Sequence, residues 1–178
     1  AFSEINSITV DPRNRNIYVT EVRDNIVSVI NRATGGVYRF AGSGFLGYGG
    51  EEENALKAHL VDIVDVSIHS QTNKVYLVQR ANNCVRVIDP LTNIISTVVG
   101  TTTPGYGGDG GPATFAMLRN PNAIVIDEIQ NLMYIADTEN HVIRLVNLTS
   151  NNISTIAGIP GEFGNTGNNG QAKQAKLN

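Results

Sequence analysis

The stretch that decides the fold is residues 121–158, PNAIVIDEIQNLMYIADTENHVIRLVNLTSNNISTIAG, in which four short apolar runs alternate with polar turns. The runs are rich in Ile, Val and Tyr, and Asn, Asp, Thr and Ser separate them, a combination typical of antiparallel strands joined by tight turns. The first run is apolar without alternation, which predicts a strand covered on both faces. The four predicted strands are Ala123–Asp127, Leu132–Asp137, Val142–Asn147 and Ile153–Ala157.

The same pattern occurs three times along the chain at a spacing of 58 residues. Tyr18, Tyr76 and Tyr134 fall at this spacing, and the glycine-rich loop 47–50 matches 105–108. The third repeat carries one extra residue near its end, where 170–172 matches 111–113 at a spacing of 59. Internal repeats of this kind indicate stacked units that share a core. Because three repeats fill all 178 residues, a second domain is not expected.

Each repeat reads as four short strands without a long helix, and this predicts an all-β chain of β-propeller blades. A short helical turn is expected in residues 112–118, with related Ala- and Leu-containing segments at 55–60 and 172–177. We therefore expect one propeller segment. Its predicted blades cover about residues 1–61, 62–119 and 120–178.

Three motifs of the third repeat carry a resemblance to a known family. They are GYGGDGGPA at residues 105–113, NLMYIADTENHVIRLV at 131–146 and ISTIAG at 153–158. They resemble the NHL repeat, a β-propeller blade, in the variant with a G-Y-x-G-D-G-G-P-A loop. The resemblance is weaker in the other repeats: Glu21 and Ser28 replace the motif residues Asp137 and Arg144, and Gln79 replaces the same Asp in the second repeat.

The resemblance implies a ring of about six blades, within the usual range of four to eight. Three blades form half of such a ring, and each end would expose an apolar blade face. The expected partners are therefore further blades, supplied either by a second copy of the chain or by the rest of a longer polypeptide. The start at Ala1 rather than Met favours the longer polypeptide. Open arcs that fail to close would instead stack into larger oligomers.

Composition excludes several classes of function. The net charge is −3, with 13 Lys and Arg against 16 Asp and Glu, which argues against a nucleic-acid partner. The apolar runs are far shorter than the roughly 20 residues of a transmembrane helix. The single cysteine, Cys84, precludes an internal disulfide and is predicted to be a buried apolar residue of a strand.

The candidate binding surface is the end of the blades that we call the upper face. There, the turns between second and third strands, 21–25, 79–83 and 137–141, are expected to lie beside the glycine-rich loops 42–53, 100–111 and 158–170. The alternative is that these segments merely cover the strand ends. Asp109 is predicted to bond nearby amides, and Asp137 and Arg144 to form a structural brace. The candidate binding residues are Asn6, Arg23, Tyr48, Arg80, Tyr106, Asp109, Asn122, Glu139 and His141.

No pattern indicates catalysis, a metal or a cofactor. His59, His69 and His141 do not share a repeat position, so they are not expected to converge on a metal. Asn6, Val64 and Asn122 are expected to face the mouth of a central channel, and they supply no acid or base. We therefore predict a non-catalytic scaffold that binds a protein, a glycan or a small ligand. The alternative is a hydrolase or lyase whose channel site is completed by other blades.

Two segments match the N-x-[ST] glycan acceptor pattern, at Asn147 and at Asn152. Both lie in or beside one predicted turn at the opposite end of the blades, the lower face. Chance matches are common in an Asn-rich chain. Glycosylation here would place the protein in the secretory pathway, and the pattern favours a secreted or extracellular location.

Overall fold

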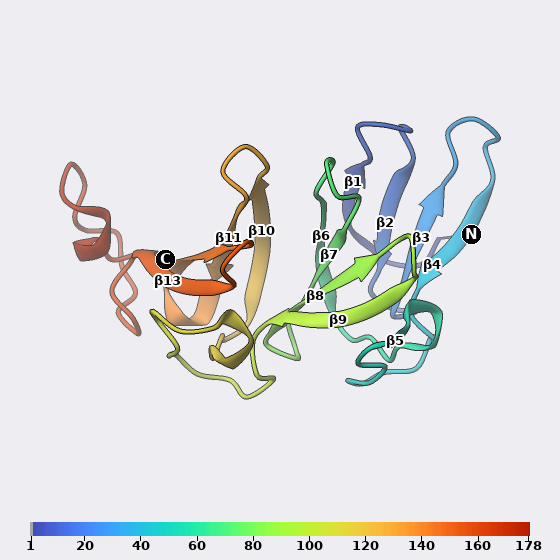
Figure 1. Cartoon of the computed structure of the whole chain (residues 1–178). Helices are drawn as coiled ribbons and strands as arrows, with labels where there is room; N and C mark the ends of the chain where they lie inside the picture. Colours follow the sequence, from blue (N-terminus) through green and yellow to red (C-terminus); the bar gives the residue numbers. More distant parts are fainter. Residues whose placement is uncertain (1) are drawn as a thin grey trace.

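Three antiparallel four-stranded sheets stand side by side in the computed structural model, which describes residues 2–178 (Figure 1). In each sheet the strands follow one another in chain order, and a two-residue strand, β5 (Glu53–Asn54), adds to the edge of the middle sheet. We call the sheets blades 1, 2 and 3. Their strands are β1 (Ile5–Val10), β2 (Ile17–Glu21), β3 (Ile26–Ile30) and β4 (Val37–Ala41); β6 (Ile63–Ile68), β7 (Val75–Gln79), β8 (Cys84–Asp89) and β9 (Ile94–Val99); and β10 (Pro121–Asp127), β11 (Leu132–Asp137), β12 (Val142–Asn147) and β13 (Asn152–Ala157).

The strands expected in the third repeat are confirmed. The first begins two residues earlier, at Pro121, and the fourth one residue earlier, at Asn152. The expected helical turns are single 3-10 turns: η1 (Ala55–Lys57), η2 (Ala113–Phe115) and η4 (Ala172–Gln174). A further turn, η3 (Thr138–Asn140), links β11 to β12. No helix in residues 2–178 is long and apolar enough to cross a bilayer.

The turn between the second and third strands of each blade has one backbone geometry. Asn25, Asn83 and His141 have φ of 54°, 51° and 55°, a left-handed conformation that Asn adopts more readily than most residues. A glycine at the end of the fourth strand lies against each turn. A Cβ on Gly158, for example, would stand 2.2 Å from the His141 carbonyl oxygen, so this position requires glycine.

The core lies between the blades. One cluster joins the face of blade 1 around Tyr18 and Val29 to the face of blade 2 around Val66 and Ile95. A second cluster joins blades 2 and 3 in the same way. Cys84 is buried, as predicted, and desolvation raises the pKa of its thiol to about 12. The blades therefore stabilise one another through stacked sheet faces.

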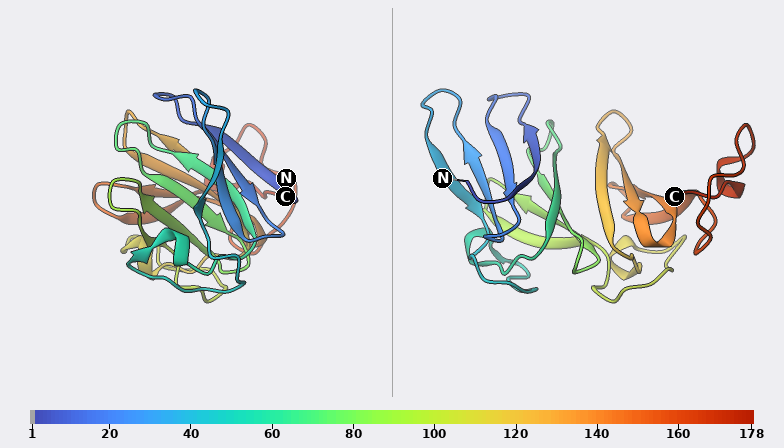
Figure 2. Two further views of the ribbon diagram at one scale, coloured as in Figure 1. Left: turned by 90° about the vertical axis from the view of Figure 1, so that its right-hand side faces the viewer. Right: turned by 180° about the vertical axis from the view of Figure 1, so that it is seen from behind.

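The outer faces of the arc lack such cover. We call the side of a blade toward the preceding one its leading face, and the side toward the following one its trailing face. Val37 of blade 1 is 54% exposed, whereas Ile95 and Ile153, at the same position of blades 2 and 3, are 0% and 1% exposed. The two end faces lie at opposite ends of the row of blades, and the C-terminal loop projects beyond blade 3 (Figures 1 and 2).

Candidate functional site

The upper face is assembled as the sequence predicted. The side-chain amide of Asn82 donates to the Gly47 carbonyl at 3.1 Å, and that of Asn140 donates to the Gly105 carbonyl at 2.7 Å. These bonds tie the turn of one blade to the glycine-rich loop that precedes that blade. At both joints between blades, the turn and the glycine-rich loop therefore lie side by side on the upper face.

A fully buried arginine lies beneath this surface in blade 3. Arg144 donates to the Gly107 and Met117 carbonyls at 2.9 and 3.2 Å, and to the carboxylates of Asp109 at 2.7 Å and Asp137 at 3.3 Å. Since Asp109 belongs to the loop that leaves blade 2, the arginine joins two blades. We call this arrangement an arginine latch. Charge-assisted bonds of this kind are strong and directional, and the predicted Asp137–Arg144 brace is confirmed.

The candidates Tyr106 and Asp109 complete the latch. The Arg144 guanidinium carbon lies 4.9 Å from the centre of the Tyr106 ring, a cation–π contact. The tyrosine hydroxyl lies 2.8 Å from the Thr155 hydroxyl oxygen, and the Thr155 amide donates to Asp109 at 3.0 Å. Both candidates therefore have structural partners, although part of each side chain remains exposed on the upper face.

The two carboxylates of this latch titrate in opposite directions. Burial raises the pKa of Asp137 above its ordinary value and outweighs the hydrogen bonds from Asn140 and the Arg119 amide. Burial also opposes ionisation of Asp109, but hydrogen bonds from Thr155 and the charge of Arg144 bring its pKa below the ordinary value. Asp109 is therefore the firmly ionised partner of Arg144.

Blade 2 contains a second arginine latch. Arg86 donates to the Gly49 and Gly50 carbonyls at 2.7 and 3.0 Å and to Glu51 at 3.1 Å, and its guanidinium carbon lies 5.2 Å from the Tyr48 ring centre. The candidate Tyr48 thus has the same role as Tyr106. Burial raises the pKa of the Tyr48 phenol, against the hydrogen bond with Thr97.

Arg80, Asn122 and Asn6 lie where the innermost strands begin. Arg80 forms a two-bonded ion pair with Asp62, at 2.8 and 3.0 Å, and also donates to Asn122 at 3.4 Å. The Asn6 side chain donates to the Val64 carbonyl at 2.7 Å. The structure therefore brings Arg80 and Asn122 together across the joint between blades 2 and 3.

One expectation at this position is wrong. Val64 does not face the channel mouth; it is 5% exposed and packs in the apolar cluster between blades 2 and 3. The strand pairing is irregular between Ile63 and Asp65, which marks a β-bulge. The first strands of blades 1 and 3 have a similar irregularity near the equivalent position. A bulge breaks the alternation of side chains along a strand, so strict alternation did not give the direction of Val64.

The other two charged candidates lie at the surface. Glu139 pairs with Arg119 at 3.0 Å and accepts from the Asn120 side chain at 2.5 Å. Arg23 is exposed, and its side chain makes no ion pair within residues 2–178. Both residues are therefore accessible on the upper face.

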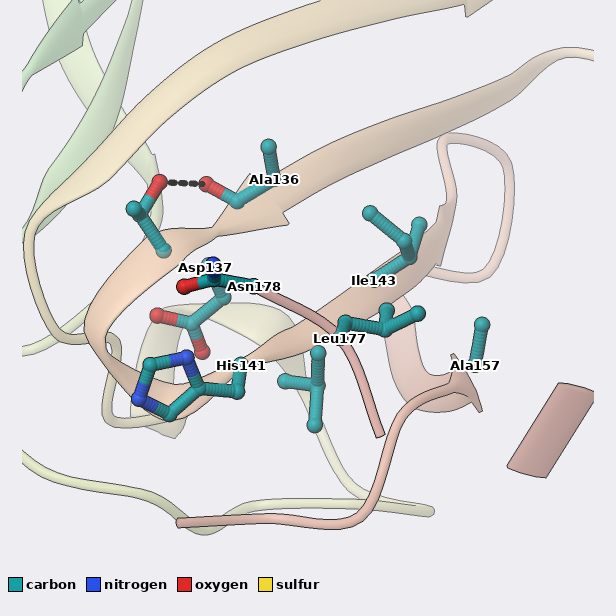
Figure 3. Close-up of a pocket in the computed structure, with 9 residues that line it drawn as sticks. Ala136, Asp137, His141, Ile143, Ala157, Leu177 and Asn178 are labelled. Atoms are coloured by element: carbon teal, nitrogen blue, oxygen red, sulfur yellow. Dashed lines mark hydrogen bonds between the residues drawn. The ribbon is translucent and has the colours of Figure 1, made fainter. Parts of the chain in front are cut away.

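The last candidate, His141, lines an open cavity of about 380 Å³ on the trailing face of blade 3, together with Asp137, Ile143 and Leu177 (Figure 3). Its ring lies 5.9 Å from the ring of Phe163. At the equivalent place in blade 2, Asn83 accepts the Asn120 backbone amide at 2.9 Å. The cavity therefore lies at the position that, in blade 2, is covered by the segment leading into the next blade.

Three upper-face residues were missed by the sequence reasoning. Phe45, Leu46 and Phe163 are 71%, 69% and 70% exposed in the glycine-rich loops. The sequence did contain a signal for them: a glycine-rich connection needs only glycine and polar residues, so large apolar residues within it are unexpected. Phe45 and Leu46 are adjacent in the loop between blades 1 and 2, whereas Phe163 lies in the loop after blade 3. Adjacent exposed apolar side chains such as Phe45 and Leu46 are typical of interaction surfaces.

Two further observations concern metals and glycans. Residues 2–178 contain no group of three or more His, Cys, Asp or Glu side chains placed to hold a metal ion. On the lower face, the Asn147 side-chain oxygen accepts the amides of Thr149 and Ser150, both at 2.9 Å, while Asn152 is exposed at the start of β13. Glycosylation at these positions stays a prediction.

Comparison with known proteins agrees with this geometry. No protein-family model matches the chain. NHL repeat-containing protein 2 of Bos taurus is 24% identical over 145 residues, which cover 78% of this chain and 20% of that protein. Protein SUPPRESSOR OF QUENCHING 1, chloroplastic, of Arabidopsis thaliana is 25% identical over 165 residues, which cover 88% of this chain and 15% of that protein. The chain thus spans about a fifth or less of the length of these curated relatives.

Solved structures show the same fold. A Bacteroides thetaiotaomicron protein of unknown function superposes with a TM-score of 0.76 at 17% identity, over 99% of this chain and 40% of that one. An auxiliary nutrient binding protein of the same organism gives 0.64 at 17% identity, over 98% and 40%. Virginiamycin B lyase from Staphylococcus aureus gives 0.56 at 15%, over 90% and 43%.

The stacked four-stranded blades and their loop-to-blade latches define a segment of a β-propeller. The chain is also similar in sequence to NHL repeat-containing proteins, which supports the resemblance of its repeats to the NHL-repeat β-propeller family. This fold supports a binding scaffold in general.

Proposed function

We propose that the chain is a non-catalytic interaction scaffold that recognises a protein through its upper face. The proposal rests on one observation: the upper face combines exposed apolar side chains with polar side chains that hydrogen bonds and ion pairs fix in place. Phe45 and Leu46 project from a loop whose neighbours are fixed by the Arg86 latch. Arg80 is held in place by Asp62.

This combination suits a protein ligand better than a glycan or a small molecule. Protein interfaces are enriched in aromatic residues and arginine, with an apolar centre and a polar rim. The upper face supplies apolar anchors in two loops and accessible charges of both signs in Arg23, Arg80 and Glu139. Because the latches fix the loops before binding, little ordering entropy is lost on association.

The alternative is a hydrolase or lyase whose channel site is completed by other blades. One structural neighbour is a lyase, but its 15% identity extends only to the fold. Around the innermost strands of residues 2–178, the polar side chains are engaged in inter-blade bonds. Asp65, for example, accepts from the Ser7 hydroxyl and the Ile124 amide, both at 2.8 Å.

The test is selection of binders from a phage-displayed peptide library, with a glycan array probed in parallel. We expect peptides that bind the parent chain and bind a Phe45→Ser/Leu46→Ser/Arg80→Ala variant at least tenfold more weakly. The matched control is Leu91→Ser/Ile129→Ser, which changes side chains that are 86% and 94% exposed elsewhere. Equal loss with the control variant, or binders only on the glycan array, would contradict the proposal.

A further inference from the structure

The two end faces of the arc carry the same kinds of side chain as the buried joints. On the leading face of blade 1, Phe2 is 38% and Ile8 65% exposed, whereas their equivalents Leu118 and Ile124 are 0% and 8% exposed. On the trailing face of blade 3, Val125 is 61% exposed and Tyr134 is half-buried. Each end is therefore shaped like one side of a blade joint.

In blades 2 and 3, the side chains that contact the preceding glycine-rich loop form a latch site. The equivalent site on the leading face of blade 1, which we call the latch socket, differs from these two in polarity. In blade 3, Asn140 and Arg144 donate hydrogen bonds to the preceding loop. Their equivalents in blade 1 are Asp24 and Ser28. An aspartate side chain is an acceptor only, and serine carries no charge, so this socket has lost its strong donors.

The socket is a cavity of about 220 Å³ lined by Glu21, Asp24 and Ser28 among others. Glu21 is 3% exposed and accepts hydrogen bonds from the Ser28 hydroxyl and, at 2.9 Å, from the Ser3 amide. Within residues 2–178 no basic side chain forms an ion pair with it. A buried carboxylate is costly unless a cation or further donors accompany it, so a matching partner must supply donors.

The glycine-rich loop after blade 3 has changed in the opposite sense. At a spacing of 59, Asn168 replaces the acceptor Asp109, Asn165 replaces Tyr106, and Lys176 replaces Met117. The earlier loops present a carboxylate to an arginine of the next blade, while this loop presents amides and an ammonium group. In this structure Lys176 pairs with Glu162 of its own loop at 2.9 Å.

The geometry of the blade 2–3 joint places these groups. The backbone carbonyl of Met117, the equivalent of Lys176, accepts a hydrogen bond from Arg144 at 3.2 Å. The same guanidinium nitrogen donates to Asp137 at 3.3 Å. The backbone carbonyl of residue 176 would therefore stand one guanidinium group away from the carboxylate at the Glu21 position. Because Ser28 is much smaller than arginine, that space is open to a lysine side chain.

We propose that the trailing face of blade 3 docks on the leading face of blade 1 of a second copy, in a latch of inverted polarity. Lys176 and the amides of Asn165 and Asn168 donate to Glu21 and Asp24 across the joint. Two identical joints close a ring of about six blades, a size within the range of known propellers. The leading face of blade 1 has lost hydrogen-bond donors, and the loop after blade 3 has gained them. These complementary changes favour a second copy of the chain over an unrelated blade as the partner. The inference is independent of the ligand proposed for the upper face.

The test is sedimentation of charge-reversal variants. The parent chain is expected near 38 kDa, twice the 19.1 kDa of one chain. Asp24→Lys and Lys176→Glu, both near the surface, should each weaken association at least tenfold. The double variant restores opposite charges at residues 24 and 176 in both joints, and it should associate more tightly than either single variant, although Glu21 remains beside the introduced glutamate. Lys57→Glu, an exposed change in the first loop, is the control and should behave like the parent.

Three results would overturn the proposal. A parent chain that sediments at 19.1 kDa at tens of micromolar would show that some other blade covers these faces. Association that survives Lys176→Glu unchanged would exclude the inverted latch. A double variant that associates as weakly as the two single variants, while circular dichroism shows that it is folded, would exclude the charge match.

Discussion

Both joints between blades contain a buried arginine at the equivalent position, but the surroundings of the two arginines differ. Arg144 lies between two carboxylates, Asp109 and Asp137. Arg86 pairs with Glu51 alone, and the place of the second carboxylate is taken by Gln79, whose side-chain nitrogen is buried without a partner. The arginine therefore needs one loop carboxylate and the loop carbonyls, while the inner acid can vary at a cost in hydrogen bonding.

The largest effect on stability is expected from Tyr76→Asp, which changes a side chain buried in the joint between blades 2 and 3. Tyr76 is 5% exposed, and the change removes a buried ring and introduces a charge without a partner. We expect a loss of about 4–6 kcal/mol in the free energy of unfolding. Urea denaturation measures it. Leu91→Asp, at an 86% exposed position in the turn between β8 and β9, is the control, and an equal loss there would contradict the burial of Tyr76 in the joint.

The next largest effect should distinguish the two latches. Arg144→Ala leaves Asp137 buried and unpaired, and we expect a loss of about 3–5 kcal/mol. Arg86→Ala leaves only Glu51, which is 43% exposed and can be hydrated, so about 2 kcal/mol is expected. Urea denaturation of both variants gives the difference. A larger loss for Arg86→Ala would break the comparison.

A smaller gain is expected from making the first joint resemble the second. Gln79→Asp removes the unpartnered amide nitrogen and gives Arg86 a second carboxylate. We expect the chain to gain about 1 kcal/mol of stability at neutral pH. Loss of stability would show that desolvation of the new carboxylate outweighs its bonds. The shift of the urea midpoint is the measurement.

The smallest effect concerns pH. The pKa of Asp109 is lowered in the folded chain, so its contribution to stability is present above the unfolded pKa and is lost as pH falls through the folded one. The stability advantage of the parent over Asp109→Asn should therefore shrink as pH falls from 6 to about 3. Melting temperatures across this range test it, and an advantage that grows on acidification would contradict the assigned direction.

Most of the fold could be predicted because it repeats. A 58-residue spacing of tyrosines and glycines fixes strand order, turn position and stacking together, since each depends on the same local pattern. The Asp137–Arg144 brace was predicted from the short hairpin that separates the two residues, not from the repeat. The hairpin between them places both residues on one side of the sheet.

The rest depended on contacts between repeats. The role of Tyr48 and Tyr106 as ring partners of the next blade's arginine follows from how far each loop reaches, which spacing along the chain does not give. The burial of Val64 follows from a bulge. The exposure of Phe45 depends on which loop residues the Arg86 latch leaves outside.

The most direct test of the latch is a double-mutant cycle on Asp109 and Arg144, with Asp109→Asn, Arg144→Leu and the combined variant. If this ion pair holds blade 3 to the loop before it, the coupling energy from urea denaturation should be about 2 kcal/mol, against less than about 1 kcal/mol for the exposed pair Arg119–Glu139. A coupling no larger than that of the exposed pair would contradict the account.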